Sequence, residues 1–424
     1  MLQLVQVVKF EKSHDTALNR FLLCRALRSP QICGHALYWS LATERDAHDE
    51  HHCCRVLLDL YARRCGAARA GLGHQVLLVS RLARIGAVVK LRAKQGASEA
   101  ELDALLRGEL QMLVLPQAFQ LPLSPFMLCR GVRVDGCRVM ASAQKPLWLE
   151  FHNAVRGAPP HVVMFKEGDD LRQDQLTLQI LRSMAALWQD AGLDLKLAPY
   201  GCVATAAKQG FIEIVQHADA FANEARPAAT NDDFRHAGLS PARRGSPAPA
   251  QSAEAVDNFA RSLAGYCVAT YVLGVGDRHN DNIMVTRDGK LFHIDFGHFL
   301  GNFKHKFGFK RETAPFVLTP HFETVLGGRH AGAAFRIFEE LSCKAFVVLR
   351  RHRDHILLLL MLLVGCGIPK LADAGDVEWV LDTLMVHEPD DDAAVRRFSK
   401  LIDEACDNKR TRSMHAIHSF VHTD

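Results

Sequence analysis

The sequence predicts an α+β fold with an all-helical first quarter, a lobe built on an antiparallel sheet, and a mostly helical remainder. Three observations predict it. Up to residue 115 or so, apolar residues recur at helical spacing. From about residue 130, short apolar runs bounded by turn residues are typical of strands. After a polar stretch that ends near residue 253, helical spacing returns.

In the first part, Phe21, Leu22, Ala26 and Leu27 show helical spacing, and so do the stretches 56–60 and 76–82. Two interruptions, Ser29-Pro30 and Gly71-Leu72-Gly73, are expected to separate helices. The pattern predicts several stacked amphipathic helices.

The second part is expected to contain strands at 137–140, 146–151, 161–166 and 211–216, with a turn at 141–145. A helix is predicted over 174–188, with one apolar face formed by Leu176, Ile180, Leu181, Met184 and Leu187. Residues 223–253 are rich in Ala, Pro, Ser and Arg and nearly lack large apolar side chains, which predicts a flexible linker. A helix over 256–273 follows.

The composition is that of a globular protein. With 424 residues, 48% of them hydrophobic, the chain is long enough for two or three domains and a substantial core. A net charge of +4 permits contact with anionic lipid or nucleotide without requiring either. The twelve cysteines are scattered and form no CxxC pair, which predicts reduced thiols in an intracellular protein and no zinc site.

Two sequence features bear on export and membrane insertion, and neither favours them. The N-terminal residues lack the pattern of a secretory signal. The most apolar run, 356–366, is shorter than the about 20 residues that cross a bilayer, so we expect a buried helix there. The expected location is the cytoplasm, with membrane contact only at the surface.

The stretch 274–297 (GVGDRHNDNIMVTRDGKLFHIDFG) carries the chemistry. Two short strands are predicted at 283–286 and 291–294, because the Asp-Gly between them is a strong hairpin signal. The hairpin would bring the loop 277–282 next to Asp295. We therefore expect Asn282 and Asp295 to face one Mg²⁺ ion, and Asp277 and His279 to lie near an attacking hydroxyl.

A hard cation held by oxygen ligands, beside a positioned acid or base, is what phosphoryl transfer from ATP needs. Asp-Phe-Gly alone, or Asp-Gly alone, carries little weight. Asp-Arg-His-Asn-Asp-Asn, a hairpin and Asp-Phe-Gly in this order form a specific signal. Protein kinases use the same Asp-x4-Asn and Asp-Phe-Gly arrangement, although His-Arg-Asp replaces Asp-Arg-His in them.

Candidate phosphate-binding residues lie upstream. Lys166 ends a predicted strand just before Gly168 and is placed to reach ATP phosphates; the alternative is a solvated strand end. The turn from Ser142 to Lys145 is either a phosphate cradle or an ordinary turn. Asp174 either orients Lys166 or stabilises the first turn of its helix.

A basic segment follows Asp-Phe-Gly. Lys304, Lys306, Lys310 and Arg311 are interleaved with phenylalanines, a pattern that suits an anionic head group at a membrane surface. The alternative is a solvated loop.

These motifs resemble those of the class I phosphoinositide 3-kinase catalytic subunit, and the resemblance covers nearly the whole chain. It is carried by VMASAQKPLWLEF (139–151), FKEGDDLRQDQLTLQILRSM (165–184), PYGC (199–202), FIEIV (211–215), GDRHNDNIM (276–284), LFHIDFG (291–297) and PFVLTP (315–320). The wording of KFEKSHD (9–15), VMAS and GDRHNDN is closest to the gamma-type subunit.

The resemblance implies a bilobal, protein-kinase-like lipid kinase domain preceded by an all-α helical (PIK) domain. The helical domain is expected at 1–115 and the kinase domain at 130–424. Within the kinase domain, an antiparallel-sheet N-lobe is expected at about 130–222, a linker at 223–253, and a mostly helical C-lobe at 254–424.

The resemblance also implies ATP and Mg²⁺ as cofactors and transfer to the inositol 3-hydroxyl of phosphatidylinositol 4,5-bisphosphate, with phosphatidylinositol or its 4-phosphate as further substrates. The resemblance also implies a role for each candidate site residue.

For the nucleotide, it implies that Lys166 and the loop Ser142–Lys145 bind ATP phosphate and that Asp174 and Tyr200 lie in the inner pocket. The adenine hinge would be Glu213 and Val215, and the pocket floor Met284 and Ile294.

For the reaction, it implies that Asp277 and His279 act at the hydroxyl and that Asn282 and Asp295 hold Mg²⁺. The lipid phosphates would contact Lys304, Lys306, Lys310 and Arg311.

The chain differs from the family in four respects. The family's preceding domains are absent, so we expect a fragment, a short isoform or a truncated gene model. Ala143 and Gln144 replace basic residues, which predicts weaker nucleotide binding. The 223–253 linker replaces folded structure. No Trp follows Trp379, which predicts weak membrane engagement.

The expected partner is a phosphoinositide at the surface of the plasma membrane, and no nucleic acid. A regulatory or adaptor subunit is compatible with a full-length form. Two other functions stay open at this point. One is a related kinase that acts on protein serine or threonine, against which the basic segment argues. The other is a catalytically weak regulator or scaffold, favoured by the missing domains.

Overall fold

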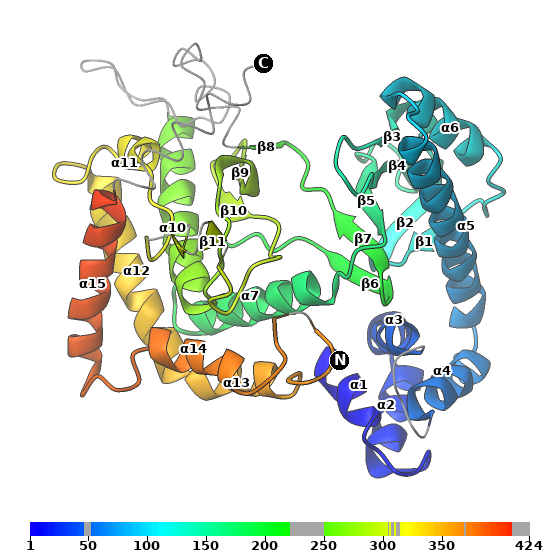
Figure 1. Ribbon diagram of the computed structural model, residues 1–424, viewed down its shortest axis with the longest axis horizontal. Coiled ribbons are helices and arrows are strands. Elements are labelled where there is room, and N and C mark those ends of the chain that lie inside the picture. Colours follow the sequence, from blue (N-terminus) through cyan, green and yellow to red (C-terminus); the bar gives the residue numbers. More distant parts are fainter. Residues whose placement is uncertain are drawn as a thin grey trace. The chain divides into compact units, whose positions relative to one another are not determined.

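The computed structural model describes residues 1–45, 52–220, 250–303, 305–306, 309–310, 314–368 and 370–408. These residues form two compact units. The first contains Met1–Leu178 and Tyr200–Val215, and the second contains Gln179–Pro199 and the described residues from Gln216 onward. Helices and antiparallel strands occur in both units, which confirms the predicted α+β class (Figure 1).

The first unit begins with four helices that enclose a core of their own. They are α1 (Leu2–Val8), α2 (Ala17–Arg28), α3 (His35–Glu44) and α4 (Cys53–Arg64). Val5, Leu22, Leu37 and Tyr61 are buried together in this core. A π-helical turn, Pro30–Gly34, separates α2 from α3 at the predicted Ser29-Pro30 interruption. Proline ends the helix because its nitrogen cannot donate to the preceding turn.

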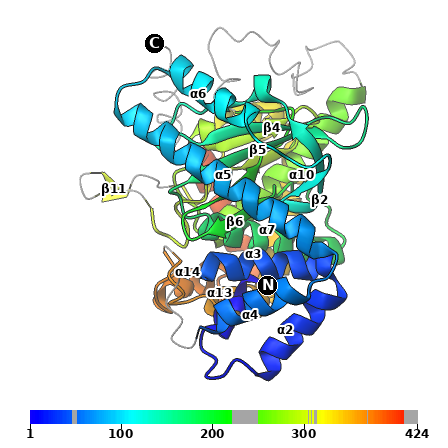
Figure 2. The same cartoon turned by 90° about the vertical axis from the view of Figure 1, so that its right-hand side faces the viewer.

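Two longer helices pack on a seven-stranded antiparallel sheet. They are α5 (Ala68–Lys94) and α6 (Glu99–Gln111), and Figure 2 shows α5 crossing the strands. The sheet has the order β1-β2-β4-β5-β7-β6, with β3 beside β4. The strands are β1 (Phe119–Leu121), β2 (Ser124–Val132), β3 (Arg138–Val139), β4 (Leu147–Asn153), β5 (His161–Glu167), β6 (Cys202–Ala206) and β7 (Gln209–Glu213).

Helix and sheet residues share one apolar core. Leu82 and Val89 of α5 and Leu106 of α6 are buried against Leu149 and Phe165 of the sheet. The two helices are therefore part of the folding unit of the sheet and not an independent bundle.

Several predicted boundaries in this unit are wrong. Gly71-Leu72-Gly73 does not end a helix, because α5 runs through it for 27 residues. Each glycine costs the helix only about 1 kcal/mol relative to alanine, and the buried stripe from Leu72 to Val89 outweighs that. The sheet begins at Phe119, earlier than expected, because β2 is mostly half-buried and so lacks a strong apolar signal. The strand expected at 211–216 is Gln209–Glu213.

The second unit is mostly helical. Its helices are the later part of α7 (Arg172–Asp190), α10 (Ala250–Val272), α11 (Pro320–Val325), α12 (Ala333–Arg351), α13 (Arg353–Met361), α14 (Gly375–Thr383) and α15 (Asp391–Asp407). Helix α12 packs between α10 and α15 (Figure 1). The Phe346 and Phe398 rings stack with centroids 4.5 Å apart. The predicted apolar face of α7 is confirmed at Ile180 and Met184.

Two small antiparallel sheets complete the second unit. One has the order β10-β9-β8, from β8 (Ala218–Ala220), β9 (Ile283–Thr286) and β10 (Leu291–His293). The other pairs β11 (His305–Lys306) with β12 (Phe309–Lys310).

Two further expectations concern the chain beyond the sheet. Helix α10 begins at Ala250, so the last four residues of the expected 223–253 linker are helical, and 223–249 lies outside the described residues.

The expectation of a buried helix over 356–366 is partly wrong. Helix α13 ends at Met361, and although Leu360 is buried, Leu358 and Met361 are 57% and 48% exposed. Among the described helices, none is both long and apolar enough to span a membrane.

The twelve cysteines all lie in the described part of the chain and are free thiols. The predicted domain boundaries at 115, 130, 222 and 253 stay predictions.

A buried histidine makes the stability of the first unit sensitive to acid. Burial lowers the pKa of His35, at the start of α3, from 6.5 to about 4, and the nearby Gln75 amide opposes this shift only in part. The neutral imidazole is the form that fits the core. The unfolded chain therefore binds a proton between these two pH values that the folded chain does not.

We predict that the free energy of unfolding falls as the pH drops below about 6.5, and that His35→Gln reduces this loss by up to about 3 kcal/mol at pH 4. Urea unfolding at pH 7.5, 5.5 and 4, followed by tryptophan fluorescence, measures this loss in wild type and variant. An identical pH dependence in wild type and variant would contradict the prediction.

Candidate active site

The hairpin at the centre of the second unit has the predicted register. Ile283 pairs with His293, Met284 with Phe292 and Val285 with Leu291. The turn is closed by the Gly289 N–H, which donates to the Thr286 carbonyl at 2.8 Å. Both predicted strands are confirmed, and the second is one residue shorter than expected. Strand β8 was not predicted, because Ala218–Ala220 is short and carries no apolar pattern.

The loop before β9 folds back on itself. Asp277 is 8% exposed and has a φ of +57°. The Asn282 side-chain nitrogen donates to the Asp277 carbonyl at 2.9 Å, and the Asn282 N–H donates to the His279 carbonyl at 2.9 Å. The loop thus places Asp277, His279 and Asn282 in one tight turn.

Arg278 joins this loop to the residues after β10. Its guanidinium donates to the carbonyls of Gly276 at 2.8 Å and Ile294 at 2.6 Å, and to the carbonyl of Asp295. The residue is 6% exposed. Because one planar guanidinium donates to carbonyls on both loops, the backbone of Asp295 is fixed relative to Asp277.

No role for Arg278 was predicted from the sequence. Its only signal was its position between two expected catalytic residues, since no spacing rule tells which carbonyls a side chain will reach.

Backbone hydrogen bonds add two more connections between the same segments. The Gly276 N–H donates to the His298 carbonyl at 3.0 Å, and the Leu300 N–H donates to the Leu273 carbonyl at 2.7 Å. The end of α10 and the Asp-Phe-Gly segment are therefore held side by side.

His293 lies under this loop as a neutral group. It is 5% exposed, and its ring centroid is 5.3 Å from that of Tyr266. Burial, and then the charge of Arg278, lowers the pKa of His293 well below its ordinary value. His293 therefore adds no second buried positive charge beside Arg278.

The predicted cation ligands lie on neighbouring segments. The Ile294 N–H donates to the Asn282 carbonyl at 3.1 Å, so Asn282 is next to the residue that precedes Asp295. The amide nitrogen of Asn282 is committed to Asp277, which leaves Oδ1 for a ligand. Asp295 is exposed, and its Oδ1 accepts the Gly297 N–H at 3.2 Å. Amide and carboxylate oxygens are the donors Mg²⁺ prefers, so these residues fit that cation.

In the first unit, Lys166 lies on the face of the sheet opposite to α5. Phe165 is buried in the core shared with α5, and side chains alternate along a strand, so Lys166 points the other way. The register Trp148↔Met164↔Ile212 places three half-buried side chains in a row on that face. An apolar row beside a lysine suits a purine with a phosphate tail.

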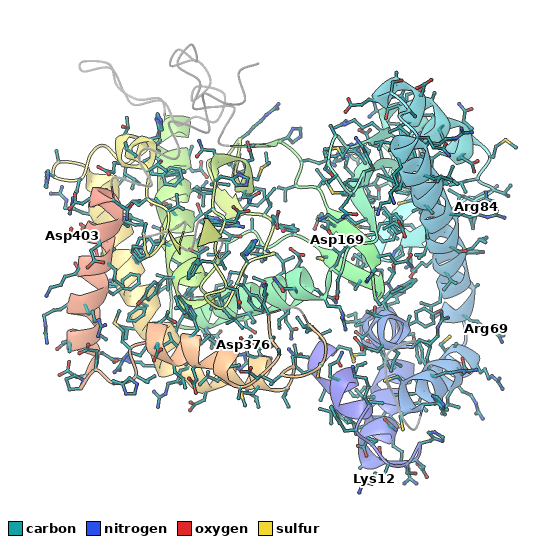
Figure 3. All side chains as sticks on the ribbon, viewed as in Figure 1. Lys12, Arg69, Arg84, Asp169, Asp376 and Asp403 are labelled. Carbon is teal, nitrogen blue, oxygen red and sulfur yellow. The ribbon has the colours of Figure 1, made fainter. Side chains whose placement is uncertain are left out.

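The immediate partner of Lys166 is Asp169. Lys166 Nζ lies 2.9 Å from Asp169 Oδ2, in the loop after β5, where Figure 3 labels Asp169. Asp174 lies in the first turn of α7, where a carboxylate stabilises the helix dipole. Its expected role in orienting Lys166 stays a prediction.

The predicted phosphate loop is a turn between β3 and β4. The Lys145 N–H donates to the Ser142 carbonyl at 3.0 Å, and Lys145 has a φ of +47°. Since Leu147 pairs with Phe165, this loop lies beside the end of β5 that carries Lys166.

The predicted adenine-pocket residues occupy both units. In the first unit, Tyr200 is buried, Glu213 ends β7 and Val215 follows it. The Glu213 N–H donates to the Gly201 carbonyl at 2.8 Å, so a hinge role for Glu213 would rest on its carbonyl. In the second unit, Met284 and Ile294 are half-buried beside the hairpin.

The predicted lipid-binding residues are described only in part. Lys306 lies on β11 and Lys310 on β12, where Lys306 pairs with Phe309. Lys304 and Arg311 lie outside the described residues.

Comparison with known families agrees with this arrangement. A sequence model of the family "Phosphatidylinositol 3- and 4-kinase" matches residues 161–237 and 243–373. A second model, "Phosphoinositide 3-kinase family, accessory domain (PIK domain)", matches residues 1–73. The two matches have the order that the sequence predicted, with the accessory domain first.

Two curated relatives align with the whole chain. Phosphatidylinositol 3-kinase 2 of Dictyostelium discoideum is 39% identical over 424 residues, and phosphatidylinositol 3-kinase 1 of the same organism is 40% identical over 430 residues. The chain spans 22% and 26% of the length of these relatives. This chain therefore belongs to the phosphatidylinositol 3- and 4-kinase family and combines its PIK accessory domain with its catalytic domain.

Proposed function

We propose that the chain is an ATP-dependent phosphoinositide 3-kinase that acts on phosphatidylinositol 4,5-bisphosphate at the cytoplasmic face of the plasma membrane. The observation that carries the proposal is the loop 277–282 tied to Asp295 through Arg278. The names of the two Dictyostelium relatives support the position of the transferred phosphate. The basic segment from Lys304 to Arg311 supports a phosphorylated head group as substrate.

In this proposal, Asp277 and His279 orient the attacking hydroxyl, and one of the two accepts its single proton. The hydroxyl oxygen forms a bond to the γ-phosphorus while the bond from phosphorus to the bridging oxygen of ADP breaks. Lys166 binds ATP phosphate, and Asn282 and Asp295 hold Mg²⁺, which neutralises the phosphate charge when bound. Catalysis then comes mainly from positioning and electrostatic stabilisation.

The first test is a lipid kinase assay with Mg-ATP and vesicles that contain phosphatidylinositol 4,5-bisphosphate. We expect phosphate at the 3-position, and a rate at least about 100-fold lower for Asp295→Ala. Asp288→Ala is the matched control, because Asp288 lies in the turn of the same hairpin, where it pairs with Lys290 at 2.6 Å. A well-folded wild-type protein that binds ATP but phosphorylates no lipid would favour a scaffold.

The second test separates lipid from protein substrates. Lys306→Glu with Lys310→Glu is expected to weaken binding to anionic vesicles at least about 30-fold, since each basic side chain near a membrane contributes about 1 kcal/mol. Vesicle sedimentation measures binding, and lipid and peptide phosphorylation are compared in parallel. Arg336→Glu with Lys400→Glu, both exposed, is the charge-matched control. Equal loss of both activities would contradict a lipid-specific role.

A third test addresses Arg278. We expect Arg278→Lys to lower kcat about 100-fold, because the compact lysine ammonium cannot reproduce the planar, widely spaced donors that reach carbonyls on both loops, and a shift of about 1 Å in the loops is costly. The KM for ATP should change little. Arg287→Lys, exposed in the hairpin turn, is the control. A normal kcat in Arg278→Lys would show that the guanidinium hydrogen bonds are not needed for activity.

A further inference from the structure

Helix α5 approaches the end of β5 unusually closely. An ideal Cβ built on Gly86 would lie 3.2 Å from the Cβ of Glu167, which a larger residue could occupy only if Glu167 moved. Lys90 lies one helical turn further along the same face of α5. Glu167 faces α5 because it alternates with Lys166 along the strand. The glycine therefore brings the helix close enough for Lys90 to reach past β5.

The Lys90 ammonium contacts three acceptors. It lies 3.1 Å from Glu167 Oε2 and 3.3 Å from Gln144 Oε1, and it donates to the Glu167 carbonyl. An ammonium has three donors, so the three acceptors match its capacity. The Lys90 and Glu167 side chains are only 20% and 31% exposed. Because the pair is partly buried, solvent and salt screen its attraction less than that of an ordinary surface ion pair.

Gly168 leaves room for the lysine. A Cβ at Gly168 would lie 2.7 Å from Lys90 Nζ, and Gly168 has a φ of +82°. The positive φ favours glycine here, and the missing side chain leaves the present position of the Lys90 ammonium open.

The contact joins two parts of the predicted phosphate site. Gln144 lies in the loop from Ser142 to Lys145, and Glu167 directly follows Lys166. Loop hydrogen bonds, such as Ser142 N–H to the Met140 carbonyl at 2.8 Å, shape the turn itself. Lys90 instead fixes the turn relative to the strand that carries Lys166.

We propose that Lys90 is a positioning residue for ATP: through Gln144 and Glu167 it holds the phosphate loop at a fixed place beside Lys166. The inference rests on the proposed function, because it assigns the loop and Lys166 to one nucleotide. Lys90 itself does not touch the nucleotide. Its contribution is a phosphate loop that is ordered before ATP arrives.

The test compares Lys90→Met with Arg84→Met in the full chain. Arg84 is a matched control: it also lies on α5, where Figure 3 labels it, and it pairs with Glu109 of α6 at 3.3 Å, remote from the phosphate loop in the contacts described. Lys90→Met is expected to raise both the Kd for Mg-AMPPNP and the KM for ATP about tenfold, with kcat nearly unchanged. Arg84→Met should change neither. Lys90→Arg, which keeps the charge, should retain most of the affinity.

Gln144→Ala provides a second route, because Gln144 is exposed and its loss should not impair folding. Its effect and that of Lys90→Met should be less than additive in the Kd for Mg-AMPPNP, as for residues in contact. Hydrogen exchange of residues 140–146 without nucleotide should speed up in both variants.

The outcomes separate the two proposals. Unchanged exchange and unchanged nucleotide affinity in Lys90→Met, with a wild type that binds Mg-AMPPNP, would overturn the role of Lys90 and leave the kinase proposal intact. A wild type that binds no nucleotide would overturn both. A fall in kcat with no change in KM would also overturn it, because a phosphate-loop support acts on nucleotide binding.

Discussion

One buried arginine determines the arrangement on which the second unit depends. The guanidinium of Arg278 meets carbonyls from the loop before β9 and from the residues after β10. Left unpaired, each carbonyl would cost about 1–3 kcal/mol, so the two loops are stable only in the arrangement that satisfies them together. Asp277 and Asp295, both at positive φ, are held in that arrangement. The positions of Asp277 and Asp295 thus depend on the hydrogen bonds of a third side chain to the backbone.

In the first unit, the positions of two important side chains likewise follow from the geometry of the backbone. Strand alternation places Lys166 and Glu167, which are neighbours in sequence, on opposite faces of the sheet. One face presents a lysine beside an apolar row, and the other receives α5 with Lys90. The lysine proposed to bind phosphate and the glutamate proposed to help hold the phosphate loop are therefore adjacent in sequence.

What could be predicted from the sequence depended on how local the cause was. The hairpin was predicted because Asp-Gly between two apolar runs is a local signal, and Asn282 and Asp295 were brought together by it. The family was predicted from long contiguous motifs, and the matches confirm the phosphatidylinositol 3- and 4-kinase family with its PIK domain, whereas the class I and gamma-type assignments stay predictions. Arg278 and Lys90 were missed because the partners that give them their roles lie on other segments, 16 residues away for the Ile294 carbonyl and 77 for the Glu167 carbonyl. Helix α5 was expected to break at Gly71 because propensity was weighed without the core it packs on.

The core shared by α5, α6 and the sheet has a practical meaning for anyone who shortens this protein. The two family matches leave residues 74–160 between them, and that interval contains most of α5, all of α6 and four of the seven strands of the sheet. A recombinant protein cut at the start of the kinase match would keep Lys166 but lose the strand beside it and the helices that cover Phe165. The smallest piece that folds is therefore larger than the piece that sequence families would define as catalytic.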